Sequence, residues 1–330
     1  MNLTNQSFLV TGGTGSFGKS FIQYVIRNLA PRRLVVFSRD ELKQSEMAQT
    51  LSPSAYPSIR YFLGDVRDCE RLEMALRGIE IVVHAAALKQ VPAAEYNPFE
   101  CIHTNVLGAE NVVRAAIRAG VKKVVALSTD KAVNPINLYG ASKLASDKIF
   151  VAANNLSGES GPKFSVVRYG NVLGSRGSVV PFFQKLINEK ARELPITHPQ
   201  MTRFWITLPQ AIQFVLESIE RMKGGEIFVP KIPSMSVSEV GKALAPGLPQ
   251  VVVGIRPGEK VHESLITEDD SHNTVDLSDR FVVTPSIRFT SFGEYRDAPK
   301  VPPGFKYTSN NNLDVLDADR LLRLLSQEEQ

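Results

Sequence analysis

The stretch Ser7-Phe8-Leu9-Val10-Thr11-Gly12-Gly13-Thr14-Gly15-Ser16-Phe17-Gly18 opens the chain with an apolar run that leads into a glycine-rich loop. The apolar run predicts a buried strand, and the apolar spacing from Phe21 to Ile26 predicts a helix after the loop. Gly12, Gly15 and Gly18 let the backbone approach a pyrophosphate, whose charge the helix N-terminus favours. The order of strand, glycine loop and helix therefore predicts a dinucleotide site. The alternative is a tight turn that binds nothing.

Apolar runs and helical patterns alternate from residue 7 to about residue 172, which predicts an α/β fold with a doubly wound parallel sheet of the Rossmann type. The further strands are expected at 34–37, 60–66, 81–87, 124–127 and 164–172, and long helices at 98–120 and 139–155. After residue 172 the segments are short and rich in proline. We therefore expect a dinucleotide-binding domain at 1–172 and a smaller, mainly substrate-binding lobe at 173–330, from which some chain returns to the sheet.

The composition is typical of a soluble globular protein, with 330 residues, 43% hydrophobic and 22% charged, and a formal net charge of +4. No apolar run approaches the roughly 20 residues that span a bilayer, and the first residues lack the pattern of a signal peptide. Cys69 and Cys101 have no metal-ligand spacing, so we expect free thiols, no metal and a cytoplasmic location. The mild charge suits an anionic small molecule and predicts neither nucleic-acid nor membrane binding.

The ends of the predicted strands indicate which dinucleotide is bound. A strand that binds NAD usually ends in an acidic residue for the ribose hydroxyls, whereas here Ser38 and Arg39 come first. Because arginine suits a 2′-phosphate, we predict NADP, and Asp40 keeps NAD possible. Asp65 either contacts the adenine or caps a helix. His84, inside an apolar run, is expected to be a packed core histidine.

A second polar stretch, Ser128-Thr129-Asp130-Lys131-Ala132-Val133-Asn134-Pro135-Ile136-Asn137-Leu138-Tyr139-Gly140-Ala141-Ser142-Lys143, follows a buried strand. Tyr139 and Lys143 are four residues apart and share one face of the predicted helix. A nearby ammonium lowers the pKa of a tyrosine, which would make Tyr139 usable as a base. The alternative is a solvated lysine beside a half-buried tyrosine.

Three arginines in the C-terminal half lie in sequences that predict turns. They are Arg176 in Gly174-Ser175-Arg176-Gly177, Arg203 in Met201-Thr202-Arg203-Phe204, and Arg256 in Gly254-Ile255-Arg256-Pro257-Gly258-Glu259-Lys260-Val261-His262-Glu263. Arginine binds a diphosphate through two parallel hydrogen bonds, so these residues are candidates for a diphosphate clamp. The alternative is that each is an ordinary surface charge.

The tail after Glu268 is polar, ends in an amphipathic helix expected at Leu313–Leu325, and carries no chemistry that the sequence reveals.

The whole chain resembles a known enzyme family. The segments 38–47, 128–143, 166–183, 201–207, 224–235 and 254–260 together resemble the inverting UDP-N-acetylglucosamine 4,6-dehydratases of the pseudaminic acid pathway, which serves the glycosylation of flagellin and bacterial surfaces. These enzymes are extended short-chain dehydrogenase/reductases. The retaining 4,6-dehydratases typically carry Asp-Glu where this chain has Asp130-Lys131. The resemblance therefore implies that C5 of the sugar is inverted.

This resemblance also implies a reaction sequence. Thr129 bonds the C4 oxygen and Tyr139 removes the C4 hydroxyl proton while hydride leaves for the nicotinamide. Neutral Lys131 then takes the C5 proton, and protonated Asp130 donates to the departing C6 hydroxyl. Hydride returns to C6, and a proton reaches C5 from the opposite face. Both protonation states are unusual in water, and we expect burial and neighbouring charges such as Lys143 to supply them.

The resemblance and the residue patterns together imply two sets of contacts. The cofactor is expected to contact Gly12, Thr14, Gly15, Ser16, Phe17, Gly18, Ser38, Arg39, Lys43, Asp65, Val66, Ala85, Lys89, Tyr139, Lys143 and Val172. The UDP-sugar is expected to contact Lys89, Asn171, Arg176, Gly177, Ser178, Val179, Val180, Arg203, Arg256 and Glu259. Asn105, in the predicted helix 98–120, resembles the asparagine that supports the active site in this superfamily. The family typically forms homo-oligomers, so self-association is also expected.

Three other functions remain open from the sequence. A retaining 4,6-dehydratase would use the same residues without inversion. A UDP-sugar 4-epimerase would use Tyr139 and Lys143 but would need no acid and base at C5 and C6, so Asp130-Lys131 argues against it. A non-catalytic NADP-sensing protein is the alternative of another class, and the presence of Tyr139, Lys143 and the glycine loop argues against it.

Overall fold

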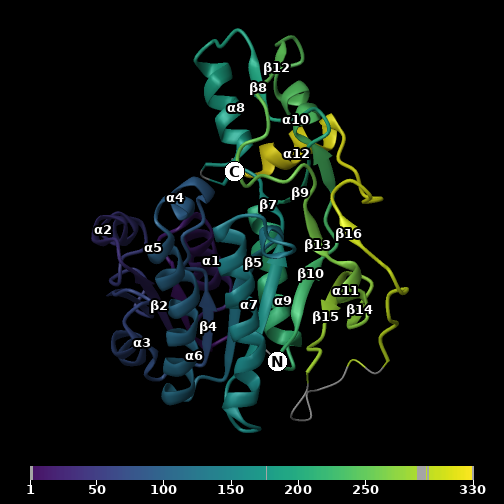
Figure 1. Ribbon diagram of the computed structural model, residues 1–330. Coiled ribbons are helices and arrows are strands. Elements are labelled where there is room, and N and C mark those ends of the chain that lie inside the picture. The colour runs from purple at the N-terminus through teal and green to yellow at the C-terminus, as the bar shows by residue number, and fades with distance from the viewer. Residues whose placement is uncertain (1–2, 176, 288–294, 296, 329–330) are drawn as a thin grey trace.

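The computed structural model describes residues 3–175, 177–287, 295 and 297–328. A nine-stranded sheet in the order β14-β15-β10-β6-β5-β4-β1-β2-β3 forms the centre of the described chain (Figure 1). Its strands are β1 (Ser7–Thr11), β2 (Arg33–Ser38), β3 (Ile59–Leu63), β4 (Ile81–His84), β5 (Lys123–Thr129), β6 (Lys163–Tyr169), β10 (Ile227–Pro230), β14 (Thr274–Asp276) and β15 (Arg280–Val283). Every pairing from β3 to β10 is parallel, and β15 and β14 add antiparallel pairs at one edge.

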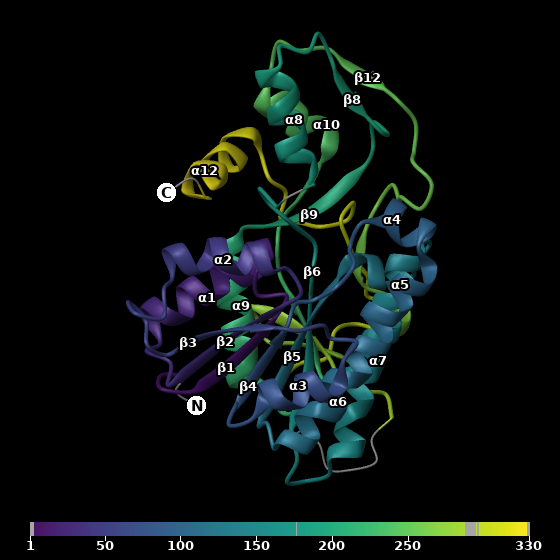
Figure 2. The same cartoon turned by 90° about the vertical axis from the view of Figure 1, so that its left-hand side faces the viewer.

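Helices cover both faces of this sheet (Figure 2). They are α1 (Ser16–Asn28), α2 (Glu41–Thr50), α3 (Cys69–Leu76), α4 (Val91–Tyr96), α5 (Pro98–Ile102), α6 (Gly108–Ala119), α7 (Leu138–Ser157), α9 (Leu208–Arg221) and the short α11 (Glu268–Ser271). Helices α1 and α9 pack together on one face, while α3, α6 and α7 form a row on the other. Among the helices of the described residues, none is long and apolar enough to cross a membrane.

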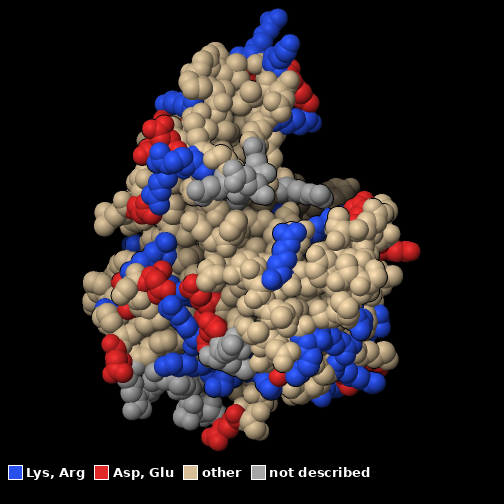
Figure 3. Space-filling model, turned by 180° about the vertical axis from the view of Figure 1, so that it is seen from behind, with Lys and Arg blue, Asp and Glu red and all other residues tan. Residues whose placement is uncertain are grey.

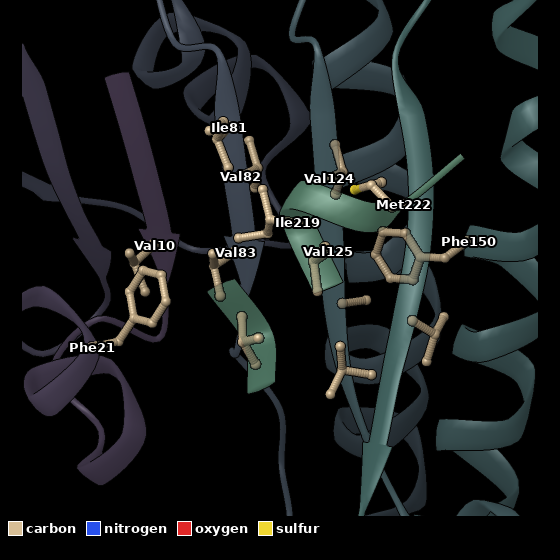
Figure 4. Close-up of a cluster of buried hydrophobic side chains, with 14 of the residues drawn as sticks. Val10, Phe21, Ile81, Val82, Val83, Val124, Val125, Phe150, Ile219 and Met222 are labelled. Carbon is tan, nitrogen blue, oxygen red and sulfur yellow. The ribbon is translucent and has the colours of Figure 1, made fainter. Parts of the chain in front are cut away.

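The core of the sheet consists of branched aliphatic and aromatic side chains that are removed from solvent. Val83 and Val125 are fully buried, as is Ile219 of α9 (Figure 4). Each such side chain contributes roughly 1.5–3 kcal/mol by leaving water. The sheet is therefore a rigid frame, and it holds the polar residues at the carboxyl ends of its strands in fixed positions.

A smaller lobe lies above the carboxyl ends of the parallel strands, where Figure 1 labels α8, α10 and α12, and Figure 3 shows it from behind. Its helices are α8 (Val179–Asn188), α10 (Val237–Leu244) and α12 (Ala318–Glu328). Its strands are β7 (Asn171–Val172), β8 (Leu194–Ile196), β9 (Thr202–Ile206), β11 (Ser234–Ser236) and β12 (Gln250–Val252). Trp205, which is 1% exposed, belongs to the separate apolar core of this lobe. The predicted fold class, a parallel α/β sheet with a smaller C-terminal lobe, is confirmed.

Several predicted elements differ in detail. The strands expected at 60–66 and 81–87 end earlier, at Leu63 and His84, and the strand expected at 164–172 divides at Gly170 into β6 and β7. The helix expected at 98–120 is interrupted by a π-helical turn, η1 (His103–Leu107), between α5 and α6. A π turn adds a residue to the helical repeat, which an apolar periodicity does not reveal.

The C-terminal tail has a larger structural part than the sequence indicates. Strand β16 (Tyr307–Thr308) pairs with β13 (Ser264–Ile266), and α12 begins later than expected. Leu321 of α12 is fully buried in the core of the smaller lobe. The tail therefore fixes β13 through its pairing with β16, and it fixes the residue before β13 through the bonds between Ser309 and Glu263.

Candidate active site

A cavity of about 1460 Å³ lies between the carboxyl ends of the parallel strands and the smaller lobe. Residues that follow β1, β2, β3, β4, β5 and β6 line it from the sheet, and residues of α8 and of the loop before β13 line it from the lobe. Strand β1 has β2 on one side and β4 on the other, so successive connections leave it in opposite directions. Ligands of open α/β sheets bind in the crevice at such a point.

The glycine loop forms one end of this cavity. Gly12 has φ of +66°, and a Cβ there would lie 2.9 Å from the backbone of Ala85. A Cβ on Gly18 would lie 2.5 Å from the carbonyl oxygen of Gly12. Helix α1 begins directly after Gly15, which provides no side-chain cap for the first amides. A backbone packed this closely at an uncapped helix start fits a diphosphate group.

Two cations and two carboxylates surround the part of the cavity beyond β2. Asp40 caps α2 by accepting a hydrogen bond from the Lys43 amide at 3.0 Å, and its other oxygen lies 2.6 Å from Lys43 Nζ. The bonds from Lys43 hold the pKa of Asp40 below its usual value. Arg39 lies 3.4 Å from Asp65, which also pairs with Arg67 at 2.7 Å. Asp40 therefore pairs with Lys43 and Asp65 with Arg39, and all four residues line the cavity, with Arg39 and Lys43 half-exposed.

The centre of the cavity is built where β5 ends. A short 3₁₀ turn, η2 (Asp130–Ala132), follows Thr129, and α7 begins at Leu138. Asp130 is fully buried, and its Oδ1 accepts a hydrogen bond from the Thr129 hydroxyl at 2.9 Å. Lys131 Nζ lies 3.1 Å from Asp130 Oδ1 and 3.3 Å from Glu263 Oε1. An amine that lines the cavity is thus held between two buried carboxyl groups.

The loop before β13 is attached at further points to the segment between β5 and α7. Asn137, the N-cap of α7, accepts from the Gly140 amide at 2.7 Å and donates to the Gly258 carbonyl at 2.7 Å. Lys260 Nζ donates to the Val133 carbonyl at 2.5 Å. The residues that face a substrate from the lobe are therefore fixed relative to those at the end of β5.

The environment of Tyr139 differs from the expected one. Burial raises its pKa to about 12, although the Lys131 ammonium and the Thr129 hydroxyl act in the opposite direction. An adjacent ammonium therefore acts on the Tyr139 pKa in the expected direction, but it comes from Lys131, and desolvation of the phenolate outweighs it. Burial also lowers the pKa of Lys143, against the opposing charge of Asp147.

The carboxylates beside Lys131 favour its charged form. Burial lowers its pKa, but the carboxylates of Asp130 and Glu263 outweigh burial and raise that pKa above its usual value. The two carboxylates therefore oppose the neutral amine that the expected reaction sequence requires of Lys131. The neighbouring charge named from the sequence was Lys143, whereas the charges with the largest effect on the Lys131 pKa are those of Asp130 and Glu263.

Two interior residues support the site from behind. Asn105, in the π turn η1, accepts from the Leu88 amide at 2.8 Å and donates to the Leu88 carbonyl at 2.9 Å and to Ser142 at 2.9 Å. Asn105 thereby ties the segment that precedes Lys89 to α7. His84 is 1% exposed, shares a hydrogen bond of 2.8 Å with Thr11, and has a pKa lowered by burial to about 3, as expected of a core histidine.

Comparison with known proteins places the chain in a family. Residues 8–285 match a protein family described as polysaccharide biosynthesis protein. The chain belongs to this family. Its members include relatives that match this chain along almost its full length, so the family resemblance predicted from the sequence is confirmed.

Three proteins that are similar to this chain are especially informative. A Campylobacter jejuni protein named UDP-N-acetylglucosamine 4,6-dehydratase (inverting) is 53% identical, with 98% of each chain covered. A Rickettsia canadensis protein named UDP-glucose 4-epimerase is 40% identical, covering 98% of this chain and 96% of its own. The X-ray structure of Pen from Bacillus thuringiensis superposes with a TM-score of 0.90 at 35% identity, covering 100% of this chain and 99% of its own.

Most residues predicted for the site line the cavity in this family member. From the sheet side these are Gly12, Thr14, Gly15, Ser16, Phe17, Gly18, Ser38, Arg39, Lys43, Asp65, Val66, Ala85, Lys89, Thr129, Lys131, Tyr139 and Lys143. From β7 and the lobe they are Asn171, Val172, Gly177, Ser178, Val179, Arg203, Arg256 and Glu259. Arg203 also donates to the carbonyls of Thr202 and Val261, so part of its guanidinium holds the protein together.

Among the described residues, two predicted site residues do not line the cavity. Asp130 is fully buried, and its Oδ1 pairs with Thr129 and Lys131, which do line the cavity. Val180 is fully buried in the core of the smaller lobe, because it is on the inward face of α8, so its prediction as a substrate contact is wrong. Arg176 lies outside the described residues.

Sequence reasoning missed Glu263 and Asn137. Glu263 ends the quoted stretch 254–263, yet no spacing rule connects it with Lys131, because the two meet only through the fold. Asn137 lies just before the predicted helix, where an asparagine is a common N-cap. Its capping hydrogen bond could therefore have been predicted from the local sequence.

Proposed function

We propose that this protein removes water from UDP-N-acetylglucosamine as a 4,6-dehydratase that inverts C5. The single observation that carries the proposal is the pair formed by Asp130 and Lys131, an acid and a base 3.1 Å apart beside Tyr139. An epimerase needs no such pair. The proposal is supported by the 53% identity to a protein named as the inverting dehydratase. Its product would be a 6-deoxy-4-keto sugar, the type of intermediate that pseudaminic acid synthesis requires.

We also propose NADP as the cofactor. The fit of the glycine loop to a diphosphate supports a nicotinamide nucleotide, which when bound would accept a hydride from the sugar and return it. Asp40 caps α2 and pairs with Lys43, so it is poorly placed to bind ribose hydroxyls. Arg39 and Lys43 line the same region and offer two positive charges to a 2′-phosphate. NAD remains the alternative that binding experiments distinguish.

The residues of this chain would move three protons. Tyr139, assisted by Thr129, would remove the proton of the C4 hydroxyl, and the resulting 4-ketone makes the C5 proton acidic. Lys131 in its neutral form would take the C5 proton. Asp130 in its acid form would protonate the departing C6 hydroxyl, which leaves as water.

Lys131 and Asp130 together would hold the same number of protons before the reaction as in the form that reacts. The resting pair of Lys131 ammonium and Asp130 carboxylate holds the same number of protons as neutral Lys131 with protonated Asp130. One proton shift across the 3.1 Å hydrogen bond interconverts them. After C5 deprotonation and loss of water the pair is again ammonium and carboxylate. The site therefore needs no proton from solvent for the elimination itself.

The sugar nucleotide would lie between the sheet and the lobe. Lys89, Asn171 and Ser178 would contact it from one side of the cavity, and Arg256 and Glu259 from the loop before β13. Arg256 is 62% exposed and lies 3.8 Å from Glu259, so it is available to a diphosphate. We also propose Gly177 and Val179 as contacts and Arg203 as a supporting cation.

A UDP-sugar 4-epimerase is the second candidate, because a full-length relative at 40% identity carries that name. Both functions would use Tyr139 and Lys143. They differ in the need for Lys131, since epimerisation at C4 removes no proton from C5. The product formed from UDP-N-acetylglucosamine therefore distinguishes the two functions.

The test is incubation of the purified protein with UDP-N-acetylglucosamine and NADP, followed by mass spectrometry. A dehydratase gives a product lighter by one water, and Lys131→Gln abolishes it. Lys148→Ala, which removes an exposed lysine from α7, is the matched control and should be fully active. An isomer of unchanged mass from the wild-type protein would favour the epimerase. Absence of any product with any UDP-sugar would favour a sensing protein.

We also propose that the enzyme is cytoplasmic and that it forms a homo-oligomer. The free thiols of Cys69 and Cys101 suit the reducing cytoplasm. Tyr96 and Phe99 are 88% and 77% exposed beside the catalytic helix α7 and would suit a contact between subunits. Size-exclusion chromatography with light scattering tests this, and Phe99→Ser should weaken the homo-oligomer.

A further inference from the structure

Glu263 has a position that the proposed reaction leaves unexplained. Its side chain is 2% exposed, yet it lines the active-site cavity. Its Oε1 lies 3.3 Å from Lys131 Nζ, while its Oε2 lies 3.7 Å from Lys260 Nζ and accepts no hydrogen bond among the described residues. Burying a carboxyl group with an unsatisfied oxygen is costly, so its retention here calls for a role.

The backbone of Glu263 is fixed by the C-terminal tail. Its amide donates to the Ser309 hydroxyl at 2.9 Å, and its carbonyl accepts from the Ser309 amide at 2.8 Å. Ser309 directly follows β16, which pairs with β13. Two chain segments far apart in sequence thus place one carboxyl group against the amine of Lys131.

The charged groups around Glu263 come from two other parts of the fold and from its own loop. Asp130 and Lys131 face it from η2, Arg203 from β9, and Lys260 from its own loop. Burial and the Asp130 carboxylate raise the pKa of Glu263, and the three cations oppose this rise. Conversely, Glu263 adds to the effect of Asp130 in raising the pKa of Lys131. The two carboxyl groups therefore compete for and share the same amine.

We propose that Glu263 is a positioning residue that holds the Lys131 amine against Asp130 and controls how readily that amine gives up its proton. The inference deepens the proposed function and rests on it for its catalytic meaning. With Glu263 as a second anchor, the amine stays between the two carboxyl groups when its proton passes to Asp130. The step transfers one proton from Lys131 Nζ to Asp130 Oδ1 and leaves a neutral amine and a carboxylic acid.

The first test needs no enzymatic activity. The rate at which acetic anhydride labels Lys131 at pH 9 measures the fraction of neutral amine, because only that form reacts. In the ligand-free protein Glu263→Gln should raise this rate at least tenfold, measured by peptide mass spectrometry relative to the exposed Lys148. Glu263→Asp, which keeps the charge, should label more slowly than Glu263→Gln. An unchanged or slower rate in Glu263→Gln would overturn the inference.

Two controls separate this effect from loss of structure. Glu268→Gln removes the same charge from an exposed side chain that pairs with Lys306, and it should leave Lys131 labelling unchanged. Thermal denaturation midpoints close to that of the wild-type protein would show that each variant keeps its fold.

The second test uses turnover of UDP-N-acetylglucosamine. In Glu263→Gln the alkaline limb of kcat should move to lower pH by one unit or more, because the amine loses its proton more easily, with KM little changed. A superimposable pH profile would overturn the inference even where the wild-type protein is an active dehydratase. Absence of product from the wild-type protein would instead refute the proposed function, and the labelling result would still decide the role of Glu263.

Discussion

Asn137 joins α7 to the loop before β13, because its side chain caps α7 and also donates a hydrogen bond of 2.7 Å to the Gly258 carbonyl. One residue therefore serves both the start of the helix that carries Tyr139 and the loop that carries Arg256. These two functions can be separated by mutation.

Asn137→Ser keeps an oxygen for the cap but has no amide for Gly258. We expect stability within about 0.5 kcal/mol of wild type, since serine is an equally good N-cap, together with a severalfold higher KM for the UDP-sugar. Asn137→Ala loses both bonds and should be destabilised by about 1 kcal/mol with a similar rise in KM. Thermal denaturation and steady-state kinetics measure the two effects. Equal KM values for Asn137→Ser and wild type would disprove the link.

The choice of cofactor depends on Arg39. Arg39→Ala should weaken NADP binding by roughly tenfold or more, because a charged hydrogen bond contributes about 1.5–3 kcal/mol, while NAD binding changes little. Isothermal titration calorimetry measures both affinities. Arg27→Ala, at an exposed position on α1 outside the cavity, is the control for loss of charge. Equal weakening of NAD and NADP binding would show that Arg39 does not bind the 2′-phosphate.

Acid should destabilise the fold through His84. Its pKa is about 3 in the folded protein against an ordinary 6.5, so the unfolded chain binds this proton first as the pH falls. The contribution is complete above pH 6.5 and declines as the pH falls toward 3. At pH 4.5 the loss from this residue is roughly 2–3 kcal/mol. His84→Asn should be less stable at pH 7 but should lose less stability between pH 7 and 4.5. Parallel losses in both proteins, measured by urea denaturation, would contradict this.

Local patterns in the sequence predict the parts of the site that are local in the chain. The glycine loop, the pair Tyr139 and Lys143, and the cations after β2 all lie beside predicted strand ends, and all line one cavity. Val180 was misplaced because sequence next to a motif does not reveal which face of α8 turns inward. The π turn around Asn105 has no periodic signature.

Long-range contacts explain what the sequence could not reveal. Lys131 meets Glu263 only because β13 and the C-terminal tail return to the end of β5. For the same reason the sequence could not show that Lys131 has a second carboxylate beside it, which raises its pKa. Charge states in such a site depend on residues brought from distant segments.

The most direct test of the inverting dehydratase is proton NMR of the reaction with UDP-N-acetylglucosamine and NADP in deuterated water. The account predicts a 6-deoxy-4-keto sugar with deuterium at C5 and the L-arabino configuration, because Lys131 removes the C5 proton and a solvent-derived one returns on the opposite face. A product with the D-xylo configuration would contradict this role of Lys131, and UDP-N-acetylgalactosamine would show that the protein is an epimerase.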